Sequence, residues 1–271
     1  MGVDAVLWCG GSPSTGAVPA PLRAACDAAG LPVASWPRPG YAGRERRPGR
    51  VVADGAADAA AALDRLGASR AVVVGYSGGG PHALAAAALE PRVVGVLALA
   101  SPAPRTLLEG AQDDDAWFRG MAFPAALRAA AAGREARERL ALVEEFDPAQ
   151  FTASDWAALE GPWGAVGDDA QAASAAAAPR ADGSPGVPDG QVDDDLALVA
   201  PWGVDLALLA GVPVVLAHGR DDLVVPPAHG ESLASAVPGA RLVRVDGAGH
   251  VAVLLEVPRL LTELARACGE Q

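Results

Sequence analysis

The most constraining feature of the sequence is residues 72–80, where a β-branched segment passes without a break into a glycine-rich turn and then a helix-forming segment. The turn is Gly-Tyr-Ser-Gly-Gly, with Ser77 between Gly75 and Gly79. A serine held between a strand and a helix has a strained main chain, and side chains two residues before and after it would collide. Because glycine removes those side chains, the spacing predicts a serine presented at a strand-to-helix turn.

This pattern has a low expected frequency by chance. The chain contains eleven serines and 32 glycines, which together give about 0.15 chance matches to Gly-x-Ser-x-Gly. The strand and the helix on either side favour a nucleophilic serine. The alternative is a glycine-rich turn without chemistry.

Length and charge restrict the class of protein. The 271 residues suit one α/β domain with an insertion, and a net charge of −12 argues against nucleic-acid and anionic membrane partners. The three cysteines lack metal-ligand spacing, so we expect free thiols and no metal. The chain has no secretory signal pattern and no apolar run of membrane-spanning length. We therefore expect a soluble, cytoplasmic protein.

Short apolar runs alternate with helix-forming stretches along most of the chain. This alternation predicts an α/β fold, with a mostly parallel sheet and helices on both of its faces. In such sheets the active site lies beyond the carboxyl ends of the strands, where Ser77 is expected. We expect strands at residues 3–8, 31–36, 72–76, 93–100, 212–217 and 241–245, and helices at 21–29, 51–66, 83–89, 228–237 and 251–267.

The alternation is interrupted between residues 102 and 205. We expect residues 1–101 and 206–271 to form the core, and 102–205 to form a helical cap, or lid, over the site. Helices are expected at 113–130 and 134–145. The alternative is an appendage that packs separately. Candidate substrate-binding residues in this segment are the aromatic Trp117, Phe118, Phe123 and Trp163.

A serine nucleophile needs a base, and the chain offers four histidines. His250 follows the last expected strand and precedes an apolar helix, which places it on a loop at the carboxyl edge of the sheet. His82 points away from the serine within the next helix. His229 is expected to be solvated at a helix start, and His218 to have a structural role. We predict that His250 is the base.

The base in turn needs a carboxylate to orient it. The loop after the strand at 212–217 supplies Asp222, and the chain order serine, aspartate, histidine is the one such folds use. Its spacing to Val225 favours Asp222 over Asp221, which remains the alternative, followed by Asp246.

Two main-chain N–H groups are needed to stabilise the oxyanion that forms on attack. Gly78 follows the serine and supplies one, and we predict that Ser12, in the Gly-Gly-Ser-Pro loop at residues 10–13, supplies the other. The alternative is that this loop cradles a phosphate, but it lacks the Gly-Lys-Ser/Thr ending of a P-loop and the chain has no lysine.

With these motifs the chain resembles the α/β-hydrolase-fold serine hydrolases, in particular the capped esterases and prolyl-aminopeptidase-like enzymes. The Arg-Pro-Gly-Tyr loop at 38–41 and the Gly-Ala-Gly-His run at 247–250 are also similar to that family. The chain departs from it at Gly10, where relatives have histidine, and at Pro37, where they often have aspartate. Most relatives have two antiparallel strands before the strand at which this chain begins. The resemblance therefore implies that these two strands are lacking.

The resemblance implies hydrolysis of an ester, lactone or related acyl bond through an acyl-Ser77 intermediate, with a small-molecule substrate and no cofactor. Enzymes of this fold with an aspartate nucleophile are disfavoured by Ser77. An aminopeptidase remains an alternative, because Glu144 and Glu145 could hold a substrate ammonium group. A non-catalytic binding protein is the other alternative.

Strand 31–36 is expected at the edge of the sheet, where unpaired main-chain groups invite pairing with another chain. Its prolines shorten that edge, so we expect a monomer, with a homodimer as the alternative.

Overall fold

A computed structural model describes residues 2–110, 113, 115–174 and 186–269. Its centre is a six-stranded sheet in which every neighbouring pair of strands is parallel, in the order β2-β1-β3-β4-β5-β6. The predicted α/β fold with a parallel sheet is therefore confirmed. The strands are β1 (Ala5–Cys9), β2 (Val33–Ser35), β3 (Ala71–Tyr76), β4 (Val93–Leu99), β5 (Val214–Gly219) and β6 (Arg241–Val245).

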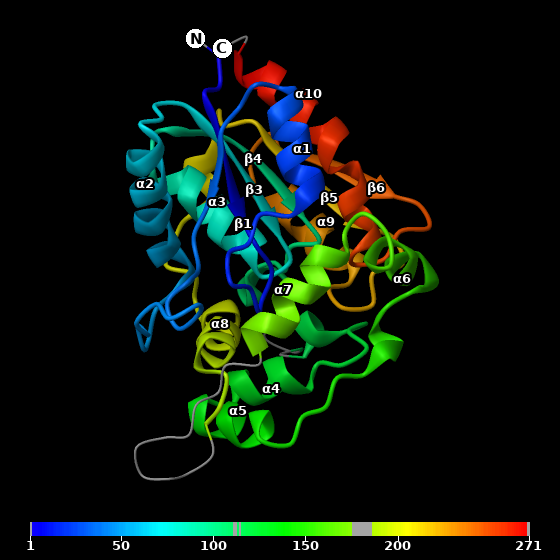
Figure 1. Ribbon diagram of the computed structural model, residues 1–271. Helices are drawn as coiled ribbons and strands as arrows, with labels where there is room; N and C mark the ends of the chain where they lie inside the picture. Colours follow the sequence, from blue (N-terminus) through cyan, green and yellow to red (C-terminus); the bar gives the residue numbers. More distant parts are fainter. Residues whose placement is uncertain (1, 111–112, 114, 175–185, 270–271) are drawn as a thin grey trace.

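Helices cover both faces of this sheet (Figure 1). Side chains alternate across β3, so that Val73 packs into one apolar cluster and Val72 and Val74 into another. The Val73 side carries α2 (Gly55–Leu66), α3 (Gly79–Leu89) and α9 (Pro227–Ala236), and the opposite side carries α1 (Ala20–Ala28) and α10 (Val257–Gly269). Because both faces are covered, β3 is buried along its whole length and is β-branched rather than alternating in polarity.

Strand β2 lies at one edge of the sheet, as its sequence predicts, and its three residues are half-buried. It pairs with β1 over Val6–Val33, Leu7–Ala34 and Trp8–Ser35. Pro37 and Pro39 follow closely, and proline cannot donate to a ladder. The edge is therefore short.

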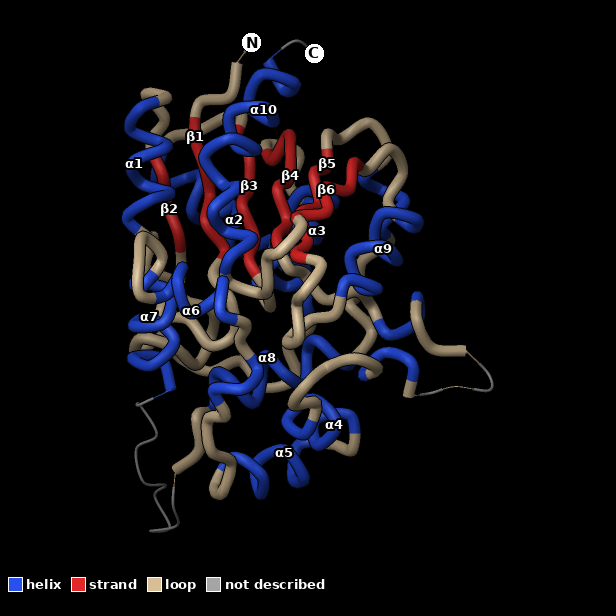
Figure 2. Tube along the Cα trace, turned by 90° about the vertical axis from the view of Figure 1, so that its right-hand side faces the viewer, coloured by secondary structure: helices blue, strands red, loops and turns tan. Residues whose placement is uncertain are grey.

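Between β4 and β5 the chain passes through further helices that lie beyond the carboxyl ends of the strands (Figures 1 and 2). We call residues 102–205 the inserted segment; of these, 111–112, 114 and 175–185 lie outside the described residues, as do 1, 270 and 271 of the predicted core. Its α-helices, in the part described, are α4 (Ala125–Ala131), α5 (Arg134–Ala141), α6 (Ala153–Leu159), α7 (Gly164–Ser174) and α8 (Asp189–Val199).

The expected helix at 113–130 is wrong. A short 3-10 turn at Ala116–Phe118 ends at Arg119, whose main chain is extended; Gly120 follows with φ +88°, and Pro124 precedes α4. The second expected helix ends at Ala141 rather than 145. Helix α8 is not among the predicted helices. It contains three successive aspartates, Asp193 to Asp195, and in the structure all three are buried.

The start of the inserted segment is held by a buried histidine. Main-chain N–H of Ala103 donates to Nδ1 of His229 at 3.1 Å, so Nε2 carries the proton and donates to the carbonyl of Trp117 at 3.0 Å. The indole N–H of Trp117 donates back to the carbonyl of Ala103 at 2.7 Å. His229 is therefore buried, 1% exposed, and the expectation that it is solvated is wrong.

This burial predicts a loss of stability in mild acid. Burial, with the nearby charge of His218, lowers the pKa of His229 to about 4. In the unfolded chain this histidine binds a proton near pH 6.5, whereas in the folded protein it binds one only near pH 4. The free energy of unfolding therefore falls as the pH falls from about 6.5 to about 4. Between pH 7 and pH 5 this one group accounts for about 2 kcal/mol.

Urea unfolding of wild type and His229→Gln at pH 7 and pH 5 measures the effect. The glutamine amide keeps a donor and an acceptor but does not titrate. The free energy of unfolding is therefore expected to fall between pH 7 and pH 5 by about 2 kcal/mol less in His229→Gln than in wild type. Equal losses in the two proteins would contradict the prediction.

Candidate active site

Ser77 lies at the turn between β3 and α3, and its main chain has φ +50°, a left-handed conformation that is unusual for serine. A methyl group on Gly75 would come within 2.6 Å of Ala83 Cβ, and one on Gly79 would overlap the carbonyl oxygens of Cys9 and Gly10. The two glycines are thus required by close main-chain packing around the serine. This is the local geometry that the spacing predicts.

The structure brings Ser77, His250 and Asp222 into one hydrogen-bonded chain. Oγ of Ser77 lies 3.0 Å from Nε2 of His250, and Nδ1 of His250 lies 2.8 Å from Oδ2 of Asp222. An ionised carboxylate only accepts hydrogen bonds, so Nδ1 carries the histidine proton and Nε2 is free to accept one from Ser77. His250 and Asp222 are buried, whereas Ser77 is partly exposed.

The carboxylate of Asp222 is held in its ionised form. Oδ1 accepts hydrogen bonds from the main-chain N–H groups of Val224 and Val225, both at 2.9 Å. Burial by itself raises the pKa of Asp222, but interactions with His250 and His218 outweigh it and hold that pKa well below its usual range. Asp222 is therefore a fixed, charged acceptor for His250.

The other candidates lie elsewhere. Asp221 is exposed, and Asp246 is exposed and paired with Arg220 at 2.5 Å. His82 is buried against the carbonyl of Val52, and His218 donates to the carbonyl of Val225 at 2.7 Å. Asp222 rather than either alternative faces His250.

Ser12 and Gly78 approach each other beside the serine. A methyl group on Gly78 would lie 2.8 Å from Cβ and 3.2 Å from the main-chain nitrogen of Ser12. Neither the Ser12 nor the Gly78 N–H donates to a main-chain carbonyl within the described part of the chain. The two donors that the sequence predicts for an oxyanion are thus close together.

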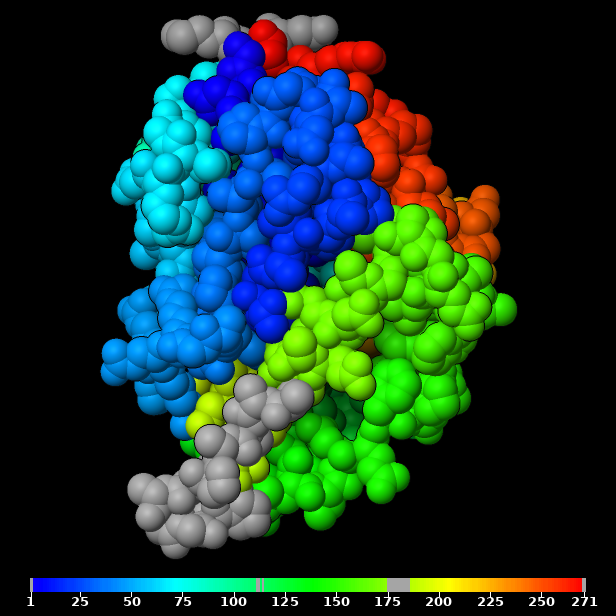
Figure 3. Space-filling view, viewed as in Figure 1, coloured from blue at the N-terminus to red at the C-terminus, as the bar shows by residue number. Residues whose placement is uncertain are grey.

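Two carboxylates of the inserted segment hold the loops that carry these groups. Asp155 of α6 is fully buried, and its Oδ1 accepts from the N–H groups of Val251 and Ala252 at 2.6 and 2.8 Å, directly after His250. Asp169 of α7 accepts from the hydroxyl of Ser14 at 2.7 Å and the N–H of Thr15 at 3.1 Å. The segment carrying α7 lies against the loop that follows β1 (Figure 3).

The four candidate substrate-binding aromatics do not form one cluster. Trp117 and Phe118 pack edge to face in a cluster within the inserted segment, and Trp163 is buried in the cluster that contains Tyr76. Phe123 is 47% exposed. Sequence reasoning missed Leu198 of α8, whose Cδ1 would lie 3.6 Å from a methyl group on Gly78. No local pattern marks this leucine, because its position depends on how α8 packs.

Glu144, the candidate ammonium-binding residue, lies just beyond the end of α5 and accepts from Arg137 at 2.8 Å. The partner of this carboxylate is thus a buried arginine.

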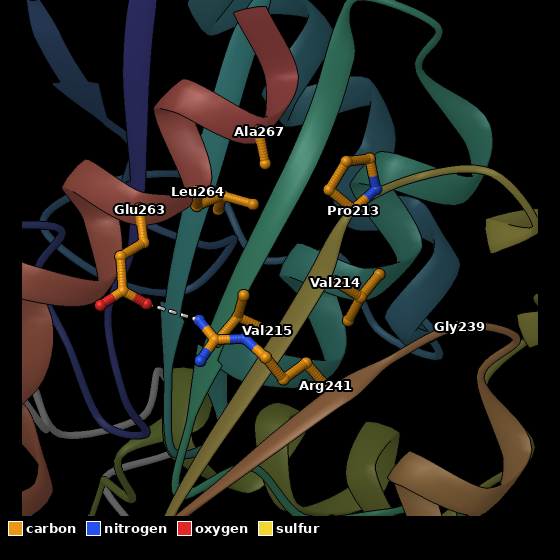
Figure 4. Close-up of a pocket in the computed structure, with 8 residues that line it drawn as sticks. All are labelled: Pro213, Val214, Val215, Gly239, Arg241, Glu263, Leu264 and Ala267. Carbon is orange, nitrogen blue, oxygen red and sulfur yellow. Dashed lines mark hydrogen bonds and ion pairs between the residues drawn. The ribbon is translucent and has the colours of Figure 1, made fainter. Parts of the chain in front are cut away.

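A separate cavity of about 350 Å³ lies between β5, β6 and α10 (Figure 4). Pro213 and Val214 line it at the amino end of β5, whereas Ser77 follows the carboxyl end of β3. The Arg241–Glu263 ion pair at 2.8 Å is its polar wall, and none of its lining residues is a serine, cysteine or histidine. It is therefore not the candidate site.

In the part of the chain that the structure describes, no three His, Cys, Asp or Glu side chains gather as a metal site requires. Over the same residues, no helix has the length and apolar character needed to cross a membrane.

The model of the family described as alpha/beta hydrolase fold matches residues 4–257, nearly the whole chain. The chain belongs to the α/β-hydrolase family. A search of curated proteins finds no sequence that matches it.

Solved structures with the same fold include hydrolases at low sequence identity. A bromoperoxidase from Bacillus anthracis has a TM-score of 0.64 and 20% identity, covering 100% of this chain and 93% of that one. An enol-lactonase from Burkholderia xenovorans has a TM-score of 0.61 and 21% identity, with 100% and 93% covered. A thermophilic esterase from Thermogutta terrifontis has a TM-score of 0.60 and 20% identity, with 100% and 90% covered. At these identities the likeness shows the fold alone.

The packing around Gly79 gives a test of this α/β-hydrolase turn. Gly79→Ala gains about 1 kcal/mol of helix propensity, but its methyl group overlaps two main-chain carbonyls that cannot rotate away. Overpacking of this kind costs about 3 kcal/mol, so we expect a net loss of about 2 kcal/mol in the free energy of unfolding.

Gly110→Ala is the control, because no described residue outside its chain neighbours lies within 4 Å of the added methyl group. Its effect on urea unfolding is expected to stay within about 0.5 kcal/mol. A Gly79→Ala protein as stable as the Gly110→Ala protein would contradict the packing described.

Proposed function

We propose that this α/β hydrolase is a serine hydrolase that cleaves an ester, lactone or related acyl bond through an acyl-Ser77 intermediate. The observation that carries the proposal is the chain of hydrogen bonds from Ser77 through His250 to the ionised Asp222. A serine hydroxyl becomes a nucleophile when a base removes its proton, and the base needs a carboxylate to fix its orientation. These three side chains have the chemistry and the distances that this requires.

In the acylation step, Oγ of Ser77 attacks the substrate carbonyl carbon while Nε2 of His250 takes the hydroxyl proton. The new imidazolium donates from Nδ1 to Asp222, which stabilises its charge. The carbonyl oxygen becomes an oxyanion and accepts from the N–H groups of Ser12 and Gly78. As the tetrahedral intermediate collapses, His250 returns the proton to the leaving alkoxide, and the acyl group remains on Ser77.

Deacylation repeats these steps with water. His250 takes a proton from the water molecule as its oxygen attacks the acyl carbon, and the same two N–H groups stabilise the second oxyanion. His250 then protonates Oγ of Ser77, and the carboxylic acid leaves. Every proton passes through Nε2 of His250, so the reaction needs no cofactor.

The inserted segment is proposed to act as a cap over this site. Its helices lie beyond the carboxyl ends of the strands, the side from which Ser77 is presented. Leu198 is the apolar side chain next to Gly78, so we expect it to contact the acyl group. The predicted roles of Trp117, Phe118, Phe123 and Trp163 in binding substrate remain proposals for this segment.

Ser77→Ala tests the proposal directly. The variant lacks the nucleophile but keeps the packing around the turn, so it should fold normally and lose hydrolysis of a panel of p-nitrophenyl esters and lactones. It should also lose labelling by a fluorophosphonate probe. A folded Ser77→Ala protein with most of its activity would refute the mechanism.

Asp222→Asn tests the orientation of the base. The amide nitrogen can donate to Nδ1, which favours the histidine tautomer that cannot accept from Ser77, and turnover should fall by about 10⁴-fold. Asp221→Asn is the matched control, because that neighbouring carboxylate is exposed and should change kcat less than about twofold. The reverse order of effects would assign the acid to Asp221.

A further inference from the structure

The mechanism above leaves unexplained a buried ionic cluster next to the Ser12 loop. Asp194 of α8 is 1% exposed, and it lies between Arg38 and Arg50, which are 3% and 5% exposed. Oδ1 of Asp194 accepts from Nε of Arg38 at 2.9 Å and from Nη2 of Arg50 at 2.5 Å. Oδ2 accepts from Nη2 of Arg38 at 2.5 Å and from the Tyr41 hydroxyl at 2.8 Å.

One more hydrogen bond connects this cluster to the candidate oxyanion site. The hydroxyl of Ser12 donates to Oδ2 of Asp194 at 2.6 Å. The carboxylate therefore fixes the side chain of the residue whose N–H is proposed to bind the oxyanion. Ser12 is far from Asp194 in sequence, so this contact exists only because α8 packs against the loop.

Arg38 holds the other side of the same peptide group. Its Nη1 donates to the carbonyl of Gly10 at 2.8 Å, and its Nη2 donates to the carbonyl of Gly11 at 2.6 Å. The carbonyl of Gly11 and the N–H of Ser12 belong to one planar amide. A charged donor on that carbonyl polarises the amide, so its N–H becomes a stronger hydrogen-bond donor.

We propose that Asp194 is a positioning residue for the proposed hydrolase reaction: through Arg38 and the Ser12 hydroxyl it fixes the Gly11–Ser12 peptide with its N–H directed at the oxyanion. The inference rests on the proposed function. Asp194 does not touch the substrate and acts by holding one donor in place before the reaction starts. Misplacement of such a donor lowers the stability of the transition state and leaves binding of the ground state nearly unchanged.

Three variants separate this role from a purely structural one. Ser12→Ala removes the hydroxyl but keeps the main-chain N–H and leaves the buried charges unchanged. Asp194→Asn removes the charge that orients Arg38. Asp193→Asn is the matched control, because Asp193 is a buried, ion-paired carboxylate on the same helix whose partners are Arg46 and Arg134.

With a p-nitrophenyl ester, Ser12→Ala should lower kcat by at least about tenfold and change KM less than about twofold, because the misplaced N–H weakens a hydrogen bond that forms only with the oxyanion of the transition state. Asp194→Asn should lower kcat by about 10²-fold. The double variant should be no slower than Asp194→Asn alone, because both changes break one connection. Asp193→Asn should change kcat less than about twofold.

Inhibition by phenylboronic acid gives a second readout, because its tetrahedral adduct with a serine places an oxygen where the oxyanion forms. We expect the inhibition constant to rise in Ser12→Ala in parallel with the loss of kcat, while near-ultraviolet circular dichroism shows an intact fold. If Asp194→Asn does not fold, the kcat and the boronate inhibition constant of Ser12→Ala test the positioning role.

The outcomes distinguish failure of the positioning role of Asp194 from failure of the proposed hydrolase function. If Ser77→Ala is inactive but folded Ser12→Ala keeps wild-type kcat and boronate affinity, the positioning role is refuted and the hydrolase proposal stands. If Ser77→Ala keeps the activity of wild type, the proposed function itself fails. A loss of stability in Asp194→Asn and Asp193→Asn alike, with unchanged kcat in both, also refutes the positioning role.

Discussion

The buried carboxylate of Asp194 joins three parts of the chain that are distant in sequence: the loop after β1, the loop after β2 and helix α8. Burial alone would raise its pKa, but the charges of Arg38 and Arg50 outweigh that effect and keep it well below the usual range. Two buried guanidinium groups face one carboxylate, so removal of Asp194 strands both charges, a change that costs about 3–5 kcal/mol. Arg38, Arg50 and Asp194 together carry one net positive charge beside the proposed oxyanion. Nearby His82 adds no charge, because burial and the charge of Arg38 lower its pKa to about 3.

Other acids of the inserted segment also hold loops in place, as Asp194 does. Asp155 fixes the main chain after His250, Asp169 fixes the loop at Ser14, and Asp194 fixes Ser12, so each acid acts on a loop of the proposed site. A cap that lifted as one body would break all of these contacts together. By contrast, the ion pairs Arg119–Asp113 and Arg128–Asp115 near α4 are exposed and weak in water. The charged contacts that stabilise the loops of the proposed site are therefore those of α6 to α8.

The strands and the order of the site residues could be predicted from the sequence, because they depend on local signals. β-Branched runs, the glycines around Ser77 and the loop positions of Asp222 and His250 are each visible within about ten residues. Helix α8 and the partners of Asp194 could not be predicted, because they depend on packing between segments more than 140 residues apart. The sequence Asp193–Asp195 shows the difficulty: three adjacent acids indicate a solvated surface, and burial is possible only because arginines face them, of which Arg50 and Arg137 are themselves buried.

The departure from the family at Gly10 has a physical reason in this loop. A Cβ at Gly10 would lie 2.4 Å from Oγ of Ser14, the group that binds Asp169, so a side chain there would displace this hydroxyl. Arg38 provides support from the opposite side through the carbonyls of Gly10 and Gly11. This requires a planar group that donates to two carbonyls and a carboxylate at once, and lysine, a point charge with three rotatable donors, does not have that geometry. Arginine at position 38 is thus required by the site, although the chain uses arginine for all of its basic residues.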